Sequence, residues 1–176
     1  MKTVLNEQQL SITIKRLAHQ ILENHPGLQN TVLIGLQPRG IFLSDRLIAE
    51  LRSITEPANI RYGILDITFY RDDVRTEIHV PNQTKIPFTV DGSKVVLIDD
   101  VLYTGRTIRA ALDALLDFGR PSKVELCALI DRRFSRQLPI QADYVGKSID
   151  SIISQRVKVL WKPRDERQEV VLLEGN

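Results

Sequence analysis

The most informative part of the sequence is Val95-Val-Leu-Ile-Asp-Asp-Val-Leu-Tyr-Thr-Gly-Arg-Thr107, near the middle of the chain. Its four consecutive apolar residues predict a buried strand over Lys94–Ile98, which two adjacent carboxylates follow directly. We expect a turn over Asp99–Gly105 and a helix over Arg106–Phe118. A continuously apolar strand followed by a turn and a helix is typical of a parallel sheet that helices cover.

The rest of the chain repeats this alternation. A first helix is predicted to begin at a cap on Asn6, with Gln9 placed to complete a capping box, and to end at His25-Pro26-Gly27. A second helix is predicted over Ile41–Leu51. The other predicted strands are Thr31–Leu36, Asn59–Phe69, Val124–Ile130, Ala142–Val145, Val157–Trp161 and Val170–Leu173. Residues 70–90 show no sustained helical or strand periodicity of apolar side chains. Irregular segments of about twenty residues in compact domains are often functional. We therefore expect one α/β domain over residues 1–176, with a largely parallel central sheet flanked by helices.

Composition excludes several classes of protein. With 43% hydrophobic and 26% charged residues, the 176-residue chain is neither disordered nor fibrous. A net charge of +2 excludes binding of nucleic acid by bulk attraction, although residues 120–167 hold 11 basic and 6 acidic side chains, which allows a local basic surface. The single cysteine, Cys127, excludes an intramolecular disulfide and is expected to be a buried thiol. We find no apolar run long enough to cross a membrane and no signal-peptide core in Met1–Gln9, so a cytoplasmic protein is expected.

The residues after the central strand suit a sugar phosphate. Backbone N–H groups at the start of the helix, with the Thr104 and Thr107 hydroxyls, can cradle a phosphate that Gly105 lets approach closely. Asp99 and Asp100 can accept hydrogen bonds from two neighbouring hydroxyls, so the combination predicts a 5-phosphorylated ribose. The alternative is an ordinary strand–turn–helix corner with aspartate caps, but adjacent carboxylates after an apolar strand cost stability unless something binds them.

Other phosphate-binding motifs do not fit. No G-x-G-x-x-G occurs in the chain. Gly146-Lys147-Ser148 resembles the end of a Walker A motif, but Gln141 stands where that motif needs its first glycine. A P-loop nucleotide hydrolase is therefore not expected.

The stretch Val95–Thr107 resembles the motif with which type I phosphoribosyltransferases bind 5-phosphoribosyl 1-diphosphate (PRPP). Ile34-Gly-Leu-Gln-Pro-Arg-Gly40 resembles their pyrophosphate loop, and Asp66-Ile-Thr-Phe-Tyr-Arg-Asp-Asp73 resembles the start of a mobile catalytic loop. With Asp113-Ala-Leu-Leu-Asp-Phe-Gly-Arg-Pro121 and Leu138-Pro-Ile-Gln-Ala-Asp-Tyr-Val-Gly-Lys147, the pattern is similar to the PyrR family of pyrimidine operon attenuators with uracil phosphoribosyltransferase activity. The resemblance implies a type I phosphoribosyltransferase-like fold with a mobile catalytic loop and a small hood region.

The resemblance also implies a reaction, in which uracil and PRPP give UMP and diphosphate. Mg²⁺ is implied as well, bound mainly through PRPP, since no direct protein cage for a metal is expected. The residues given catalytic roles are Asp99, Asp100, Arg71 and Asp72. The expected PRPP- and phosphate-binding residues are Val101, Leu102, Tyr103, Thr104, Gly105, Arg106 and Thr107, and those of the pyrophosphate loop are Pro38, Arg39 and Gly40. Two alternatives stay open: Arg71–Asp73 as a solvated charge run, and Ile130, Asp131 and Arg132 as a strand-end salt bridge rather than the border of the base pocket.

The resemblance also implies regulation through RNA. Lys15, His19, Arg136 and Lys147 are candidate contacts to a pyr operon leader mRNA, with UMP as effector, in a homodimer or dimer of dimers. Asp131–Gln141 is one residue longer than its family counterpart and lacks a glycine, and Trp161–Arg167 replaces the family's acidic turn. A phosphoribosyltransferase without RNA-binding regulation, or one acting on a purine or orotate, therefore remains an alternative.

Overall fold

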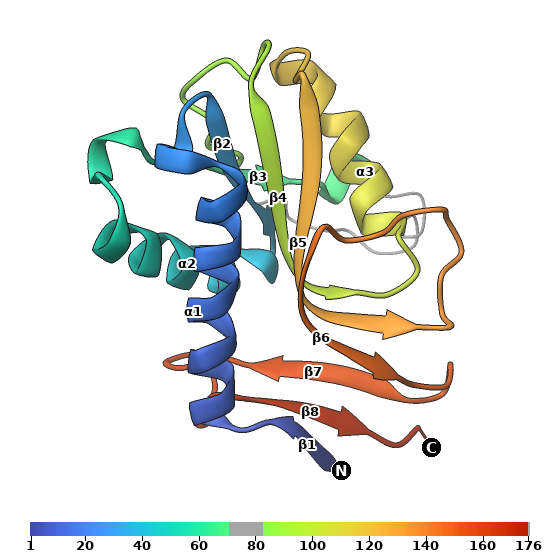
Figure 1. The fold of residues 1–176 in the computed structure, drawn as a ribbon. Coiled ribbons are helices and arrows are strands. Elements are labelled where there is room, and N and C mark those ends of the chain that lie inside the picture. Colours follow the sequence, from blue (N-terminus) through green and yellow to red (C-terminus); the bar gives the residue numbers. More distant parts are fainter. Residues whose placement is uncertain (71–82, 176) are drawn as a thin grey trace.

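The computed structural model describes residues 1–70 and 83–175, and a five-stranded parallel sheet in the order β3-β2-β4-β5-β6 forms its centre (Figure 1). Its strands are β2 (Thr31–Gln37), β3 (Arg61–Asp66), β4 (Lys94–Leu102), β5 (Lys123–Arg133) and β6 (Tyr144–Asp150). Every pair of neighbours in this sheet is parallel, which confirms the predicted α/β fold. The carboxyl ends of the strands consequently meet at one edge of the sheet, which is where ligands bind in such folds.

Helices cover both faces of this sheet. The helices α1 (Glu7–Asn24) and α2 (Gly40–Ile54) pack with Val96 and Ile98 of β4 in one apolar core, and α3 (Arg106–Leu115) packs with Val95 and Leu97 in the other. Successive side chains of a strand point to opposite faces, so the apolar run of β4 feeds both cores. Short 3₁₀ turns complete the helical segments: η1 (Pro26–Leu28), η2 (Pro57–Asn59), η3 (Thr68–Tyr70) and η4 (Leu116–Phe118).

The first helix begins and ends as predicted. The Asn6 side chain accepts the Gln9 N–H at 2.9 Å, and the Gln9 side chain accepts the Asn6 N–H at 3.0 Å, which is a complete capping box. Its buried face is the predicted apolar stripe, and the helix ends at Asn24 with His25 as its C-cap. Cys127 is fully buried in the same core, as expected.

A second, antiparallel sheet lies beyond the carboxyl ends of the central strands, at the bottom of Figure 1. Its strands follow the order β1 (Lys2–Leu5), β8 (Glu169–Leu173) and β7 (Arg156–Leu160). This sheet is the hood region that the resemblance implied. β1 was not predicted, because four residues with two exposed polar side chains carry too short an alternation to recognise.

Several predicted boundaries are wrong. The strand predicted over Asn59–Phe69 is the shorter β3, and the one predicted over Ala142–Val145 begins later and ends later, as β6. Asp99–Gly105 is not a turn throughout, because β4 continues to Leu102. β5 extends alongside it, with Val101 paired to Ile130 and Leu102 to Asp131, so the neighbouring strand provides a ladder that the local sequence does not reveal. The helix predicted over Arg106–Phe118 is α3 followed by the 3₁₀ turn η4.

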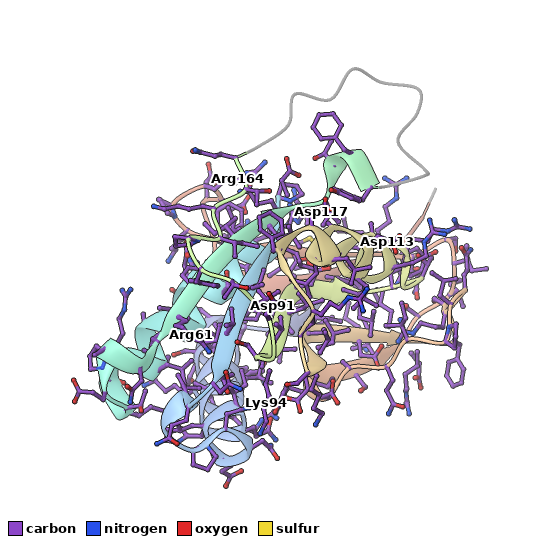
Figure 2. All side chains as sticks on the ribbon, turned by 90° about the horizontal axis from the view of Figure 1, so that it is seen from above. Arg61, Asp91, Lys94, Asp113, Asp117 and Arg164 are labelled. Atoms are coloured by element: carbon purple, nitrogen blue, oxygen red, sulfur yellow. The ribbon has the colours of Figure 1, made fainter. Side chains whose placement is uncertain are left out.

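Figure 2 views the molecule from the opposite, amino end of the central strands. Arg61 and Lys94 begin β3 and β4, and Asp113 and Asp117 lie along α3 and η4. Among the described helices, none is long and apolar enough to span a membrane.

Candidate active site

Two buried carboxylates lie at the carboxyl end of β4. Asp99 and Asp100 are only 7% and 4% exposed, and the Asp100 N–H donates to Asp99 Oδ1 at 2.9 Å. Arg39 reaches across from the end of β2, where its Nε donates to Asp100 Oδ2 at 3.1 Å and its Nη2 to the Val159 carbonyl of the hood at 2.5 Å. Burial raises the pKa of Asp100, and Arg39 offsets only part of that rise. A buried acid with a raised pKa in a site of this kind points to function.

The predicted pyrophosphate loop lies directly beside this acidic pair. β2 ends at Gln37, a cis peptide bond joins Gln37 to Pro38, and α2 begins at Gly40. A Cβ atom on Gly40 would lie 2.5 Å from the Ile98 carbonyl oxygen and 3.2 Å from Asp99 Oδ1. Only glycine therefore allows the loop to pack against β4, and this packing brings Arg39 to the carboxylates.

The end of β4, the loop that follows it and the start of α3 line a cavity of about 420 Å³. Its lining contains Asp99, Val101, Leu102, Tyr103, Thr104, Gly105, Arg106, Thr107, Ile108 and Gln137. Gly105 has a φ of +94°, a left-handed conformation that favours glycine, and it is the N-cap of α3. Because the first N–H groups of a helix lack intrahelical partners and its dipole is positive at that end, this cavity suits a phosphate.

All seven residues predicted to bind phosphate thus lie together at this end of β4, next to Asp99 and Asp100. Gln137, which also lines the cavity, was not predicted. Its Oε1 accepts a hydrogen bond from Arg106 Nε at 2.8 Å, a contact between positions 31 residues apart that the sequence does not signal.

The residues predicted to border the base pocket have structural partners at the end of β5. Ile130 is fully buried in the core, and Asp131 forms an ion pair with Arg136. Arg132 is 5% exposed, donates to Ser151 Oγ at 2.8 Å, and lies with its guanidinium carbon 4.0 Å from the centre of the Tyr103 ring. The strand-end salt bridge is therefore present, and the base pocket stays a prediction.

The other predicted catalytic residues, Arg71 and Asp72, lie outside the described residues. The chain before them is described up to Tyr70, whose hydroxyl donates to Asp117 of η4. The described chain resumes at Gln83, whose carbonyl accepts a hydrogen bond from Gln37 Nε2 at 2.8 Å. Gln37 directly precedes Pro38, Arg39 and Gly40 of the pyrophosphate loop.

The four candidate RNA contacts divide into two places. Lys15 and His19 are exposed on α1, and Arg16 between them donates to the Gly146 carbonyl of β6 at 2.5 Å, which places them near the exposed Lys147. Arg136 lies apart from these three, because its guanidinium contacts the Tyr103 carbonyl and Asp131 beside the phosphate cavity.

The donor groups of the site fit Mg²⁺ carried by a substrate. Residues 1–70 and 83–175 contain no group of three His, Cys, Asp or Glu side chains that could hold a metal. Mg²⁺ prefers oxygen ligands and is commonly bound through one or two carboxylates and substrate phosphates, with several waters retained. Asp99 and Asp100 beside the phosphate cavity meet that requirement.

Residues 1–164 match the family model described as the phosphoribosyl transferase domain. The fold and the site thus define a phosphoribosyltransferase. Curated relatives called bifunctional protein PyrR come from Pelotomaculum thermopropionicum, 46% identical over 97% of this chain and 94% of that protein, and from Deinococcus deserti, 48% identical over 97% and 93%. The chain belongs to the PyrR family.

Solved structures confirm the fold independently. The hypoxanthine phosphoribosyltransferase of Trypanosoma cruzi superposes with a TM-score of 0.76 at 19% identity, covering 100% of this chain and 98% of that one. The enzyme from Staphylococcus aureus gives a TM-score of 0.70 at 19% identity over 99% and 91%. At these identities the likeness concerns the fold alone.

Proposed function

We propose that this chain transfers the phosphoribosyl group of PRPP to uracil, forming UMP and diphosphate. The observation that carries the proposal is the buried pair Asp99 and Asp100 beside a cavity that opens at the start of α3. One part of the site suits a diol and the other suits a phosphate, which is the combination that a ribose 5-phosphate presents. Membership of the PyrR family favours uracil as the base.

The reaction breaks the bond from ribose C1 to the diphosphate, which leaves with the bonding electron pair. It forms a bond from C1 to the base nitrogen, whose proton is released to solvent. Positive charge develops at C1 in the transition state, so catalysis consists mainly of positioning and electrostatic stabilisation. Asp99 and Asp100 accept hydrogen bonds from the ribose hydroxyls and stabilise that charge. The loop Tyr103–Thr107 holds the 5-phosphate and so fixes the position of C1 relative to the base.

The leaving diphosphate carries several negative charges. Arg39, which already lies 3.1 Å from Asp100, supplies a forked donor at the pyrophosphate loop. Mg²⁺ carried by PRPP would supply further charge neutralisation, and Asp99 and Asp100 are the carboxylates that could contribute to holding it. Arg71 and Asp72 complete the proposed catalytic set, and Ile130, Asp131 and Arg132 are proposed to border the uracil.

The activity is tested by incubating the protein with radiolabelled uracil, PRPP and Mg²⁺ and measuring labelled UMP. Unlabelled hypoxanthine or orotate in excess is expected to leave the rate unchanged. Strong inhibition by either base, or label transfer to it in a matched assay, would favour a purine or orotate phosphoribosyltransferase instead. Removal of Mg²⁺ with a chelator is expected to abolish turnover and readdition to restore it.

A second function is favoured by the word bifunctional in the relatives' name and by the exposed basic groups of α1 and β6. We propose that UMP promotes binding of a pyr operon leader mRNA to Lys15, His19 and Lys147, in a cytoplasmic homodimer or dimer of dimers.

In a gel-shift titration, UMP is expected to tighten binding of leader RNA but not of a scrambled RNA. The variant Lys15→Gln/His19→Gln is expected to weaken it, and Lys158→Gln, an exposed lysine of β7, is the control. Light scattering gives the oligomeric state, and binding that ignores UMP would contradict regulation.

A further inference from the structure

The phosphate cavity is bordered by the segment Phe134–Ile140, which follows β5 and lies against the loop Tyr103–Gly105. Leu138 and Ile140 lie against Gly105, where a Cβ atom would be 3.4 Å from Leu138 Cβ and 3.2 Å from Ile140 Cδ1. The two segments are thus in direct contact, and the second of them is where the sequence departs from its family pattern. We call Phe134–Ile140 the strap.

The strap bonds to two consecutive carbonyl groups of the phosphate loop. The Arg136 guanidinium donates to the Tyr103 carbonyl. The next carbonyl, that of Thr104, accepts the N–H groups of Gln137 at 3.0 Å and Leu138 at 3.2 Å. Both peptide groups therefore have fixed orientations, set by donors from a segment about 33 residues further along the chain.

The orientation of these carbonyl groups determines where the neighbouring N–H groups point. In a trans peptide unit the C=O and N–H bonds are coplanar and point in opposite directions. When the Tyr103 carbonyl points to the strap, the Thr104 N–H points away from it, and the same relation holds between the Thr104 carbonyl and the Gly105 N–H. Both N–H groups are thereby directed away from their carbonyl partners in the strap, and both residues line the cavity.

The strap is itself held in place. Arg136 forms an ion pair with Asp131 at the end of β5, so its guanidinium bridges that strand and the loop. Arg132 packs its guanidinium on the Tyr103 ring at 4.0 Å, while Nη2 donates to the Gln155 carbonyl at 2.9 Å and to the Ile152 carbonyl at 3.1 Å. The loop is thus positioned by groups that are buried or half-buried and already oriented before a ligand arrives.

We propose that the strap is a preorganising element of the PRPP site, whose backbone orients the Gly105 N–H group and whose Arg136 is a positioning residue that turns the Thr104 N–H group toward the 5-phosphate. This inference rests on the proposed function for the identity of the ligand. It also reassigns Arg136, which the sequence suggested as an RNA contact, to the enzyme site. A preorganised anion site avoids reorienting peptide groups on binding, so its loss is expected to weaken PRPP binding more than it slows turnover.

The test compares Arg136→Gln with Arg133→Gln, which removes the same charge three residues away. Arg133 is a matched control because it pairs with the exposed Asp150 on β6, with 2.7 Å between Nε and Oδ1. Calorimetry gives the dissociation constant for PRPP with Mg²⁺, and kinetics gives KM for each substrate. Arg136→Gln is expected to raise the dissociation constant and KM for PRPP about tenfold, with KM for uracil within about twofold. Arg133→Gln is expected to change each within about twofold.

The conservative variant Arg136→Lys is expected to lie between the wild type and Arg136→Gln, because an ammonium keeps the charge but lacks the fork that reaches both partners. If Arg136→Gln does not fold, Arg136→Lys carries the test. Equal PRPP affinities for Arg136→Gln and Arg133→Gln, or a lowered melting temperature with unchanged PRPP affinity, would overturn the positioning role. A wild type that binds PRPP but forms no UMP would instead overturn the proposed function alone.

Discussion

Two buried carboxylates lie at opposite ends of the central sheet and differ in what surrounds them. Glu125, near the amino end of β5, is 6% exposed, and Asp100, at the carboxyl end of β4, is 4% exposed. The Glu125 carboxylate lies 2.5 Å from Lys123 Nζ, 2.6 Å from His25 Nε2 and 2.8 Å from the Tyr144 hydroxyl. Asp100 has Arg39 on Oδ2, and the adjacent Asp99 lines the phosphate cavity.

The two pKa values move in opposite directions as a result. Burial by itself raises the pKa of Glu125, but the hydrogen bonds from Lys123, His25 and Tyr144 outweigh it and lower the pKa to about 2. At Asp100 the effect of burial exceeds that of Arg39, and the pKa is raised. The comparison teaches that burial alone does not identify a functional acid. Glu125 is satisfied within the fold and stabilises it, whereas the Asp100 carboxylate is held at a cost that a bound ligand offsets.

The largest expected effect comes from removing both charges at the carboxyl end. Asp99→Asn/Asp100→Asn is expected to lower kcat/KM for UMP formation by about 1000-fold or more, because both ribose contacts and the charge stabilisation at C1 are lost. Its melting temperature at neutral pH should equal or exceed that of the wild type, because the raised pKa of Asp100 means that its charged form destabilises the folded protein. Asp113→Asn, at an exposed position of α3, is the control. An unfolded double variant would show that these carboxylates stabilise the protein instead.

Removing the charge of Glu125, at the amino end of the central sheet, should lower stability and leave activity nearly unchanged. Glu125→Gln breaks a buried network of three partners and is expected to lower the free energy of unfolding by about 3 kcal/mol. kcat/KM measured well below the melting temperature should stay within about twofold, because this network is at the other end of the sheet. Denaturant titration and steady-state kinetics check the two parts, with the exposed Glu166→Gln as reference. A large loss of activity in folded Glu125→Gln would contradict the conclusion that Glu125 stabilises the fold without contributing to the active site.

Glu125 and Asp100 should change the stability of the folded protein in opposite directions as the pH falls. The pKa of Glu125 falls from 4.5 to about 2 in the folded protein, so its stabilisation is present above pH 4.5 and is lost as the pH falls toward 2. The wild type should therefore lose about 3 kcal/mol more than Glu125→Gln across that window. Asp100 acts in the other direction, since a raised pKa favours the folded state as the pH falls. The stability advantage of Asp100→Asn over the wild type should thus shrink in acid, as urea titrations at several pH values would show.

A smaller effect is expected from two glycines with positive φ. Gly105, at the phosphate loop, has a φ of +94° and lies against Leu138 and Ile140, whereas Gly92, at the amino end, has a φ of +64° and nothing within 4 Å of an added Cβ. Alanine at either position should lower the free energy of unfolding by about 1 kcal/mol through backbone strain. Only Gly105→Ala should also raise KM for PRPP, by about tenfold, because its Cβ would displace the loop. Equal kinetics for the two variants would mean that the loop tolerates this displacement.

The sequence predicted the features that depend on neighbouring residues. The capping box of Asn6 and Gln9, the apolar run of β4 and the turn at Gly105 each depend on a few consecutive positions, and each is present. The placement of the phosphate-binding residues with Asp99 and Asp100 followed from the same local pattern. The resemblance to a family then supplied what local patterns do not contain, including the hood.

Contacts between distant positions were beyond the sequence. The pairing of His25 with Glu125 spans 100 positions and that of Arg39 with Asp100 spans 61, and no local pattern encodes either. β4 is longer than predicted because β5 runs beside it, and β1 exists because β8 pairs with it. Arg136 was grouped with surface cations, since its two partners become visible only once the chain is folded.

The central claim is that Asp99 and Asp100, with the adjoining cavity, form the PRPP site, whereas Glu125 belongs to the scaffold. Calorimetric titration of PRPP with Mg²⁺ into the wild type, Asp99→Asn/Asp100→Asn and Glu125→Gln tests it without depending on the base. We expect the double variant to bind PRPP at least about 100-fold more weakly and Glu125→Gln to bind within about twofold of the wild type. Unchanged binding by the folded double variant would contradict the account.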